Sequence, residues 1–285
     1  MAPPEYHLES FWDERFGKEN HFEWLGDGQQ TILPVLRDTL NTHAPSSNQQ
    51  KTEQEDIPRL LHIGAGTSTL SDDIINIYRE KFGNVKEATV LNTDFSKTAI
   101  ERGNMVEEAR GSRAVRWERA DMLAWEDVKV LVKGSKDDDD VELFKIVVEK
   151  STSDAISCAE DIVLQPLKPS TSSIFPLLQS YLARQPHLNF SIQPMKLLSL
   201  HLAAVVAPNG VWLALSYSQE RFQFLAEQEG KETQSEICPS LYWRVEGVRG
   251  VDAPSGQEAA GVYTPRIQHY VYVLRRTEIR IDLAL

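Results

Sequence analysis

From Arg59 onward the sequence alternates short apolar runs with longer amphipathic stretches. Runs rich in β-branched and aliphatic residues predict strands, and apolar residues spaced three and four apart predict helices. The predicted strands are 59–63, 88–93, 115–120, 144–149, 210–216, 241–248 and 268–275. The predicted helices are 29–40, 71–82, 96–110, one from 154 onward, 192–206 and 220–228. Such alternation predicts βαβ units in a mostly parallel sheet that helices cover on both faces.

The last two predicted strands have no helical stretch between them. Only the loop GVRGVDAPSGQEAAGVYTPR separates them. Parallel neighbours need a long crossover, whereas antiparallel strands do not, so we expect these two to pair antiparallel at one edge. The sequence therefore predicts a Rossmann-like, doubly wound α/β sheet of seven strands, with an antiparallel C-terminal edge strand.

The chain of 285 residues is long enough for one large domain with appended segments. The polar, hydrophobic-poor stretch NTHAPSSNQQKTEQED predicts a flexible linker. The predicted parts are an N-terminal aromatic arm with a helix (1–40), the linker (41–56), the main domain (57–277) with insertions near 129–143 and 160–190, and a C-terminal tail (278–285).

Charge and cysteine content narrow the classes of partner. With 30 Lys and Arg against 42 Asp and Glu, the formal net charge is −12. This argues against a nucleic-acid partner, which requires basic patches, and leaves small molecules or a basic protein. The run Asp137–Asp140 is expected to be a solvated loop, and Cys158 and Cys238 have neither disulfide-framework nor metal-site spacing. Because the sequence has no signal-peptide or membrane-span pattern, we expect a soluble, cytoplasmic protein. Because it has no metal-site spacing, we expect no metal.

The first strand of the main domain runs into two glycines. It ends at Ile63, and Gly64 and Gly66 open the turn into the next helix. Glycines let a ligand approach the backbone, and the helix N-terminus offers unpaired N–H groups, although a purely structural turn has the same pattern. Thr69 stands where the dinucleotide fingerprint has its third glycine. This favours a nucleoside cofactor without phosphates, and S-adenosylmethionine is the obvious candidate.

Acidic residues follow the second and third strands. Asp94 is placed to accept hydrogen bonds from both hydroxyls of a ribose, because Ser96 is available as the N-cap of the following helix. Asp121 is expected to supply a polar contact, and Met122 an apolar face, for an adenine ring. Because the carboxyl ends of parallel strands meet at one edge of a sheet, these residues are expected to line one site.

The fourth strand also ends in a polar cluster. It consists of Glu149, Lys150, Ser151, Thr152 and Asp154. Ligand-suitable residues at four consecutive strand ends are stronger evidence for a site than any one of them. The sequence has no phosphate-binding P-loop, no nucleophile elbow and no zinc-binding motif.

The N-terminal arm is rich in aromatic residues. Trp12 and Phe16 are one helical turn apart, and Trp24 follows. Such rings either pack onto the core or fold over a cofactor and close its site. Aromatic faces also attract a sulfonium cation.

These motifs together resemble the class I, seven-strand S-adenosylmethionine-dependent methyltransferases. Within them, the chain is similar to the branch that includes the lysine methyltransferases of translation elongation factor 1-alpha. The matching segments are FWDERF and FEWLG in the arm, GAGTSTLS, NTDFS and VVEKSTSDA at three strand ends, and QHYVYVLRR near the C-terminus. The resemblance covers most of residues 6–276. Thr67 replaces the family's Asn in the glycine loop, and Ser151 replaces its Gly after the Lys.

The resemblance implies S-adenosylmethionine as cofactor and S-adenosylhomocysteine as product. With the glycine-loop residues, the expected cofactor contacts are Trp12, Phe16, Trp24, Gly64, Gly66, Ser68, Asp94, Phe95, Asp121, Met122 and Lys150. Methyl transfer is an in-line displacement, for which positioning supplies much of the catalysis. If the acceptor is a lysine, whose reference pKa is about 10.4, Glu149 or Asp154 is the candidate to orient the amine or take its proton.

Three functions are compatible with the sequence. The first is a protein lysine methyltransferase that acts on elongation factor 1-alpha or a similar basic protein, which suits an acidic enzyme. The second is a small-molecule N-, O- or S-methyltransferase, with the insertions forming a lid. The third is a non-catalytic protein that keeps the fold and has no cofactor affinity. An open acidic groove favours the first, and a buried apolar cavity favours the second.

Overall fold

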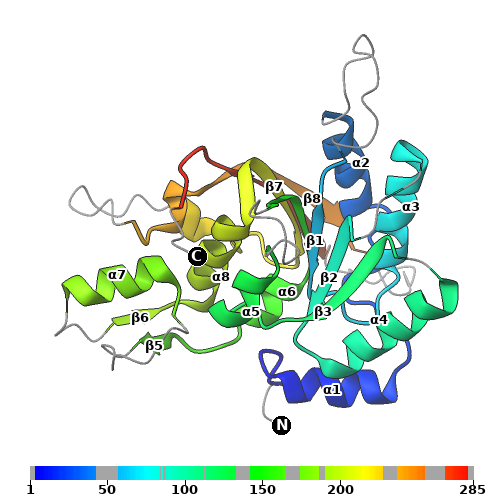
Figure 1. The fold of residues 1–285 in the computed structure, drawn as a ribbon, viewed down its shortest axis with the longest axis horizontal. Helices are drawn as coiled ribbons and strands as arrows, with labels where there is room; N and C mark the ends of the chain where they lie inside the picture. Colours follow the sequence, from blue (N-terminus) through cyan, green and yellow to red (C-terminus); the bar gives the residue numbers. More distant parts are fainter. Residues whose placement is uncertain are drawn as a thin grey trace, which may run out of the picture.

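A seven-stranded sheet forms the centre of the protein (Figure 1). The computed structural model describes residues 4–42, 57–83, 85, 88–111, 113–132, 142–164, 174–185, 190–226, 236–253 and 267–281. The strand order is β3-β2-β1-β4-β7-β9-β8. The strands are β1 (Leu60–Ile63), β2 (Val90–Asp94), β3 (Val115–Arg119), β4 (Phe144–Lys150), β7 (Val206–Ser216), β8 (Trp243–Asp252) and β9 (Gln268–Arg276).

The pairing confirms the predicted topology. β1, β2, β3, β4 and β7 are mutually parallel, and β9 is antiparallel to both β7 and β8. The last two strands thus form one edge, with β8 outermost. Within the sheet, the chain enters at β1 in the middle, continues outward through β2 to β3, and then crosses to β4 on the other side of β1. Open α/β sheets bind ligands at the carboxyl ends of strands beside such a reversal.

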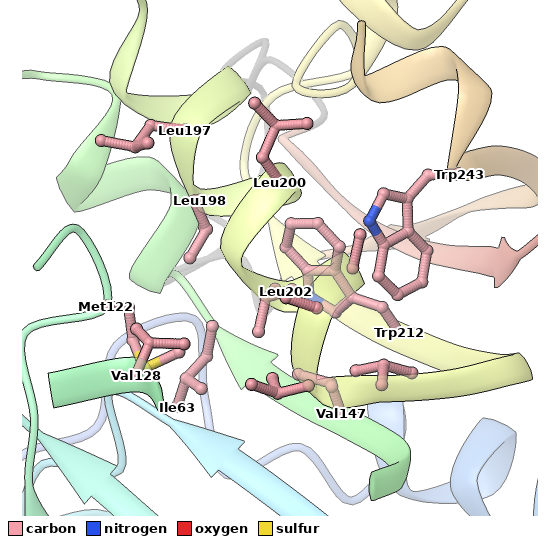
Figure 2. Packing of buried hydrophobic residues seen from close by; sticks show 14 of the residues in the cluster. Ile63, Met122, Val128, Val147, Leu197, Leu198, Leu200, Leu202, Trp212 and Trp243 are labelled. Carbon is pink, nitrogen blue, oxygen red and sulfur yellow. The ribbon is translucent and has the colours of Figure 1, made fainter. Parts of the chain in front are cut away.

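Helices cover both faces of the sheet (Figure 1). They are α1 (Glu9–Lys18), α2 (Ile32–Thr42), α3 (Leu70–Phe82), α4 (Lys97–Arg110), α5 (Trp125–Val130), α6 (Thr152–Ile156), α7 (Pro176–Arg184) and α8 (Pro194–Val205), with 3₁₀ turns at Gln223–Leu225 and Pro239–Leu241. Alternate strand residues enter two separate cores, because successive side chains of a strand point to opposite faces. Leu60 packs with α2 and α3, whereas Leu61 and Ile63 pack with α5 and α8. Figure 2 shows Leu198 and Leu202 of α8 close to Ile63 and Trp212 in the second core.

The connection from β2 to β3 shows how local sequence sets these elements. The Ser96 hydroxyl accepts a hydrogen bond from Ala99 N (3.2 Å) and caps α4, and Gly111 ends α4 in the left-handed conformation. On the inner face of α4, a Cβ at Gly103 would lie 2.2 Å from the Trp117 ring of β3. Glycine is therefore needed there for the helix to approach the sheet.

Several predicted elements differ from the structure. The predicted helix at 220–228 is only a 3₁₀ turn, Gln223–Leu225, within the residues described. The sequence did not predict α5, α7 or the two-stranded sheet of β5 (Ile162–Leu164) and β6 (Phe190–Ile192), which lie in or near the predicted insertions. Most of the predicted linker and the run Asp137–Asp140 lie outside the described residues. Among the helices that the structure describes, none has the length and apolar character of a membrane span.

Candidate active site

A cavity of about 380 Å³ lies at the carboxyl ends of β1 to β4, next to the N-terminal arm. All eleven predicted cofactor contacts line it: Trp12, Phe16, Trp24, Gly64, Gly66, Ser68, Asp94, Phe95, Asp121, Met122 and Lys150. Asp154 also lines the cavity, whereas Glu149 is not among its lining residues. The structure therefore brings together residues from four strand ends and from a segment far away in the sequence.

The two glycines of the first turn are required by close packing. Gly64 has a φ of +61°, and a Cβ there would lie 2.0 Å from Thr152 Oγ1, whose hydroxyl donates to the carbonyl of Ile63 (3.0 Å). Gly66 has a φ of +54°, and its Cβ would lie 3.1 Å from the ring of Phe16. Side chains at these positions would push α6 and the arm away from the loop. The glycines thus have a structural role as well as a place in the cavity wall.

Asp94 fixes the shape of the glycine loop. Its Oδ2 accepts a hydrogen bond from Gly66 N (2.9 Å) and its Oδ1 one from Ser96 N (2.8 Å). Burial raises the pKa of this carboxyl to about 6, although the two backbone donors oppose the shift. Since Ser96 caps α4, Asp94 is not needed as the helix cap. Each carboxylate oxygen retains a lone pair for a further donor, such as a ribose hydroxyl.

The turn after β3 is held by a hydrogen bond within it and by residues of α5 and α8. Asp121 N donates to Asp127 Oδ2 (2.9 Å), and Leu123 N donates to Asp121 Oδ1 (2.9 Å). The carbonyl of Met122 accepts from His201 Nδ1 (2.9 Å). Burial lowers the pKa of His201 to about 4, so the ring is neutral at physiological pH. The sequence did not point to His201, because its partner is 79 residues away.

Glu23 of the arm binds two residues that line the cavity, Ser68 and Lys150. Its carboxylate pairs with Lys150 and accepts hydrogen bonds from Ser68 Oγ (2.8 Å) and Thr69 N (2.8 Å), at the start of α3. Lys150 also donates to the carbonyl of Gly26 (2.6 Å). Burial alone would raise the pKa of Glu23, but the bonds from Lys150, Thr69 and Ser68 bring it below its ordinary value. Glu23 thus occupies the helix terminus where a pyrophosphate would bind, in agreement with the absent third glycine.

Two further acidic residues fasten α1 to the rim. Asp13 accepts from Ser96 Oγ and from Thr98 N (3.1 Å) at the N-terminus of α4. Glu9 pairs with Arg119 at the end of β3 (2.7 Å). Like Glu23, these side chains join the arm to residues that lie beyond the linker in the sequence.

The aromatic residues of the arm form one wall of the cavity. The Trp12 ring lies 5.6 Å from Phe16 and 5.8 Å from Trp24, measured between ring centroids. Tyr6 packs edge-on against Trp24 at 4.9 Å, and its carbonyl accepts a hydrogen bond from Trp12 Nε1 (2.6 Å). The rings pack on one another and line the cavity, so the packing interpretation is confirmed, and closure over a cofactor stays a prediction. Their π faces are suited to a sulfonium cation.

Replacing Glu23 with glutamine is expected to loosen the arm. Lys150, only 5% exposed, would then be a buried cation without a carboxylate. Removal of one partner of a buried pair costs about 3–5 kcal/mol, so hydrogen exchange of residues 9–26 should accelerate and S-adenosylhomocysteine affinity should fall at least 10-fold. Hydrogen-exchange mass spectrometry and calorimetry measure the two effects. The control is Glu14→Gln, which removes an exposed pair with Lys18 on the same arm and should change neither. Equal behaviour of the two variants would contradict the role of the Glu23–Lys150 pair in holding the arm in place.

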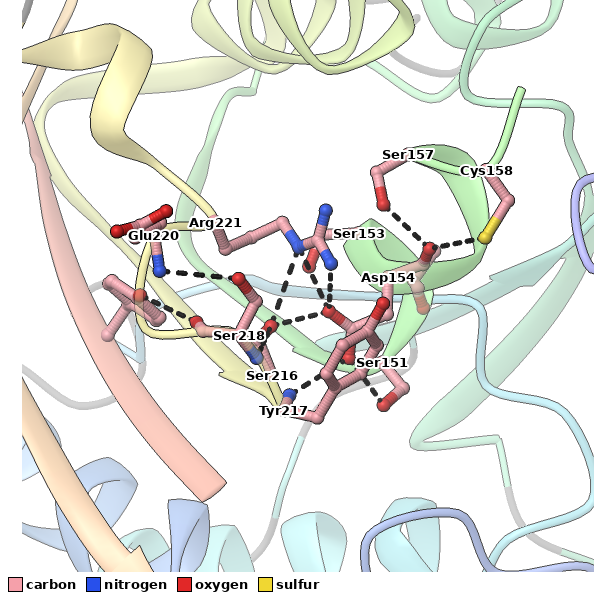
Figure 3. Close-up of polar contacts among 12 residues, drawn as sticks. Ser151, Ser153, Asp154, Ser157, Cys158, Ser216, Tyr217, Ser218, Glu220 and Arg221 are labelled. Atoms are coloured by element: carbon pink, nitrogen blue, oxygen red, sulfur yellow. Dashed lines mark hydrogen bonds and ion pairs between the residues drawn. The ribbon is translucent and has the colours of Figure 1, made fainter. Parts of the chain in front are cut away.

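The two carboxylates at the β4 end have structural partners. Glu149 is fully buried, and its Oε2 accepts from Thr152 N (2.8 Å) and Ser153 N (3.2 Å), beneath the start of α6. Burial raises its pKa to about 8, which keeps it protonated at neutral pH. Asp154 is held in a network with Arg221 and with residues at the end of β7 (Figure 3). Neither carboxylate stands free in the cavity.

Glu149→Gln is expected to remove a pH dependence of stability. Because the pKa of Glu149 is about 8 in the folded protein and 4.5 ordinarily, the folded state retains a proton that the unfolded state releases. Stability from this group is therefore complete below pH 4.5 and falls as pH rises toward 8. Urea unfolding at pH 5, 6.5 and 8 should show a smaller decline for Glu149→Gln than for the wild type. Glu101→Gln, on an exposed face of α4, should retain the wild-type slope, and a parallel slope for Glu149→Gln would refute the assignment.

Among the described residues, no group of three or more His, Cys, Asp or Glu side chains is arranged to hold a metal ion.

No family model matches the sequence. The chain is 28% identical over 273 residues to the methyltransferase srdJ of Neurospora crassa, a match that covers 95% of this chain and 84% of that one.

A solved structure shares the fold. A S-adenosylmethionine-dependent methyltransferase from Anabaena variabilis matches 97% of this chain and 96% of its own, with a TM-score of 0.51 and 9% identity. The N-methyltransferase NodS of Bradyrhizobium japonicum, solved with S-adenosylhomocysteine, matches 93% of this chain and 98% of its own, but with a TM-score of 0.43 and 14% identity it is too distant to inform the site. The strand order and the shared fold show that the chain has the class I methyltransferase fold, and its sequence relative srdJ is a methyltransferase.

Proposed function

We propose that the protein methylates an uncharged, largely apolar small molecule. The observation that carries this proposal is the absence of a free carboxylate at the β4 side of the cavity, within the residues described. Glu149 lies outside the lining, and Asp154 is neutralised by Arg221. A lysine ammonium entering there would lose its hydration without gaining a counter-charge, which is costly. A neutral acceptor does not incur this cost.

The remaining residues on this side support an apolar acceptor. Leu123, Ala155, Ile156 and Tyr217 line the cavity between the end of β3 and the end of β7. Apolar and aromatic walls with few polar groups are typical of small-molecule sites. In the proposed roles, Asp94 orients the ribose and the turn at Asp121 receives the adenine.

The donor supplies an electrophilic methyl group on a sulfonium. An N-, O- or S-nucleophile of the acceptor forms the new bond to carbon, and the pair of the breaking S–C bond stays on sulfur. The acceptor's proton then leaves to solvent. The protein's contribution is to align the two partners and exclude water, as in other reactions accelerated by positioning.

A protein lysine acceptor is the second candidate. The net charge of −12 favours it, since an acidic surface attracts a basic protein. The resemblance of the arm and of the β4 end to the elongation factor 1-alpha lysine methyltransferases favours it as well. In that case the lysine would need a proton acceptor other than the paired Asp154.

Labelled S-adenosylmethionine distinguishes the two candidates. The purified protein is incubated with the labelled donor and cell extract, and proteins are separated from small molecules. Label in the small-molecule fraction without a labelled protein band is the expected result. A single labelled protein band would overturn the proposal in favour of the second candidate. Calorimetric titration with S-adenosylhomocysteine, run in parallel, shows whether the cofactor site is intact.

A further inference from the structure

We propose that Tyr217 is the surface on which the acceptor packs, and that the buried Asp154–Arg221 pair positions it. The inference rests on the methyl-transfer function proposed above. Tyr217 directly follows the last residue of β7, and its side chain lines the cavity although it is 52% exposed. An aromatic side chain that is both exposed and part of a cavity wall stands at the mouth of that cavity.

The strand order places Tyr217 on the acceptor side. The predicted ribose and adenine contacts follow β2 and β3, on one side of β1. β7 lies on the other side, beyond β4, and Lys150 pairs with Leu215 there. Ser151 N donates to the carbonyl of Leu215 (2.8 Å), which ties the two strand ends together. Tyr217 is thus separated from the adenosine end by the width of two strands, β1 and β4.

A buried ion pair fixes the backbone of Tyr217 (Figure 3). Asp154 Oδ1 accepts from Arg221 Nε (2.9 Å) and Nη2 (2.8 Å) and from Ser216 Oγ. Its Oδ2 accepts from Ser151 Oγ (2.9 Å) and from Tyr217 N (3.1 Å). The side chains of Asp154 and Arg221 are 5% and 11% exposed. A carboxylate so buried and so fully bonded has little freedom to move, and the Tyr217 backbone shares that restriction.

A second contact holds the following residue. Tyr272 of β9 donates its hydroxyl to the carbonyl of Ser218 (2.7 Å), and Ser218 N donates to Ser216 Oγ (3.0 Å). The backbone is therefore anchored on both sides of Tyr217. Among the described residues, no other aromatic ring stacks on Tyr217, and the Arg221 guanidinium lies 5.5 Å from its centroid.

A rigid backbone that carries a half-exposed ring is a preorganised binding surface. Aromatic faces bind flat apolar groups by offset or edge contacts, while a tyrosine hydroxyl stays in contact with water. Because the backbone is already fixed, little conformational entropy is lost when the acceptor packs on the ring. The acceptor chemistry that fits is a small molecule with a planar, unsaturated or aromatic portion next to the methylated atom.

The test uses Tyr217→Ala and Tyr217→Phe in the labelling assay described above. Initial rates are measured against dilutions of the small-molecule fraction, which yields a half-saturating dilution and a maximal rate. Tyr217→Ala should raise half-saturation about 10-fold, as expected for loss of an aromatic contact of about 1.4 kcal/mol. Tyr217→Phe should stay within about threefold, because the ring is retained. Binding of S-adenosylhomocysteine should be unchanged in both variants. Tyr181→Ala, on α7 and outside the cavity lining, is the matched control.

The positioning role of Arg221 requires a double-mutant comparison. Arg221→Met combined with Asp154→Asn removes both charges together, so that neither is left buried and unpaired. This pair of substitutions should raise half-saturation as Tyr217→Ala does, and adding Tyr217→Ala to it should have little further effect. Additive effects would show that the ion pair and Tyr217 act independently and would overturn the positioning role.

The inference and the proposed function fail in different ways. Unchanged half-saturation in Tyr217→Ala overturns the inference, whichever product is labelled. If label appears only in a protein band, the small-molecule proposal fails, and the same dilution series on that band still decides whether Tyr217 contacts the acceptor.

Discussion

Gly64→Ala is expected to destabilise the protein more than any other single methyl addition in the glycine loop. The new Cβ would lie 2.0 Å from Thr152 Oγ1, in a backbone conformation with φ of +61° that alanine disfavours. Overpacking of about 1–3 kcal/mol and left-handed strain of about 1–2 kcal/mol act together. Thermal unfolding should show a midpoint several degrees below that of the wild type.

Gly111→Ala isolates the contribution of strain. Gly111 has a φ of +59°, nearly that of Gly64, but a Cβ there would meet no atom within 4 Å. Gly111→Ala should therefore lower the free energy of unfolding only by the left-handed backbone strain, about 1–2 kcal/mol. Adding Thr152→Ala to Gly64→Ala removes the two closest contacts and should restore part of the loss. If Gly64→Ala and Gly111→Ala lowered the midpoint equally, the packing argument would be wrong.

Asp94→Asn is expected to weaken S-adenosylhomocysteine binding by about 100-fold or more, since two hydrogen bonds to a charged group contribute about 1.5–3 kcal/mol each. The amide would turn an N–H₂ donor toward either Gly66 N or Ser96 N, both of which are donors. The glycine loop would lose its hydrogen bond to residue 94, and the ribose would lose a hydrogen-bond acceptor. Isothermal titration calorimetry measures the change, and Asp72→Asn, an exposed carboxylate on α3, should leave affinity unaltered.

The pH dependence of binding provides an independent check on Asp94. With a pKa of about 6 in the free protein, this carboxyl takes up a proton as pH falls through that value and loses acceptor capacity. Wild-type affinity should therefore decline between pH 7 and pH 5, whereas that of Asp94→Asn should stay flat over the same range. A wild-type affinity independent of pH would contradict the assignment.

The sheet was predictable because strand and helix leave different periodicities in the sequence. All seven predicted strands are present, and most boundaries agree within one or two residues. β8 differs more, because it continues to Asp252 and not only to 248, into the stretch predicted as a loop. β7 begins at Val206, not at 210, because Pro208, Asn209 and Gly210 lie within an irregular part of the strand. The register with β4 shifts there and Asn209 takes a φ of +63°. The three residues predict a turn and instead form a local distortion of the strand.

That the predicted cofactor contacts line one cavity was also predictable, because topology alone brings successive strand ends to one rim. The partners of those residues were not. Glu23 pairs with Lys150 across 127 residues, and Arg221 bonds Asp154 across 67. No local pattern encodes such pairs. Alternation along β4 separates Glu149 from its neighbour Lys150, but it does not show which of the two faces the cavity and which lies beneath α6, because that depends on the turn that follows the strand.

The ion pair between Glu23 and Lys150 has a consequence for synthesis on the ribosome. The arm is made first, but Lys150 is made 127 residues later. At about 5–20 residues per second, the arm waits roughly 6–25 seconds for its partner. β1, β2 and β3 are made within that interval, so Ser96 and Arg119, the partners of Asp13 and Glu9, are present before Lys150. The Glu23–Lys150 pair is therefore the last of the three acidic contacts between the arm and the rim to be completed.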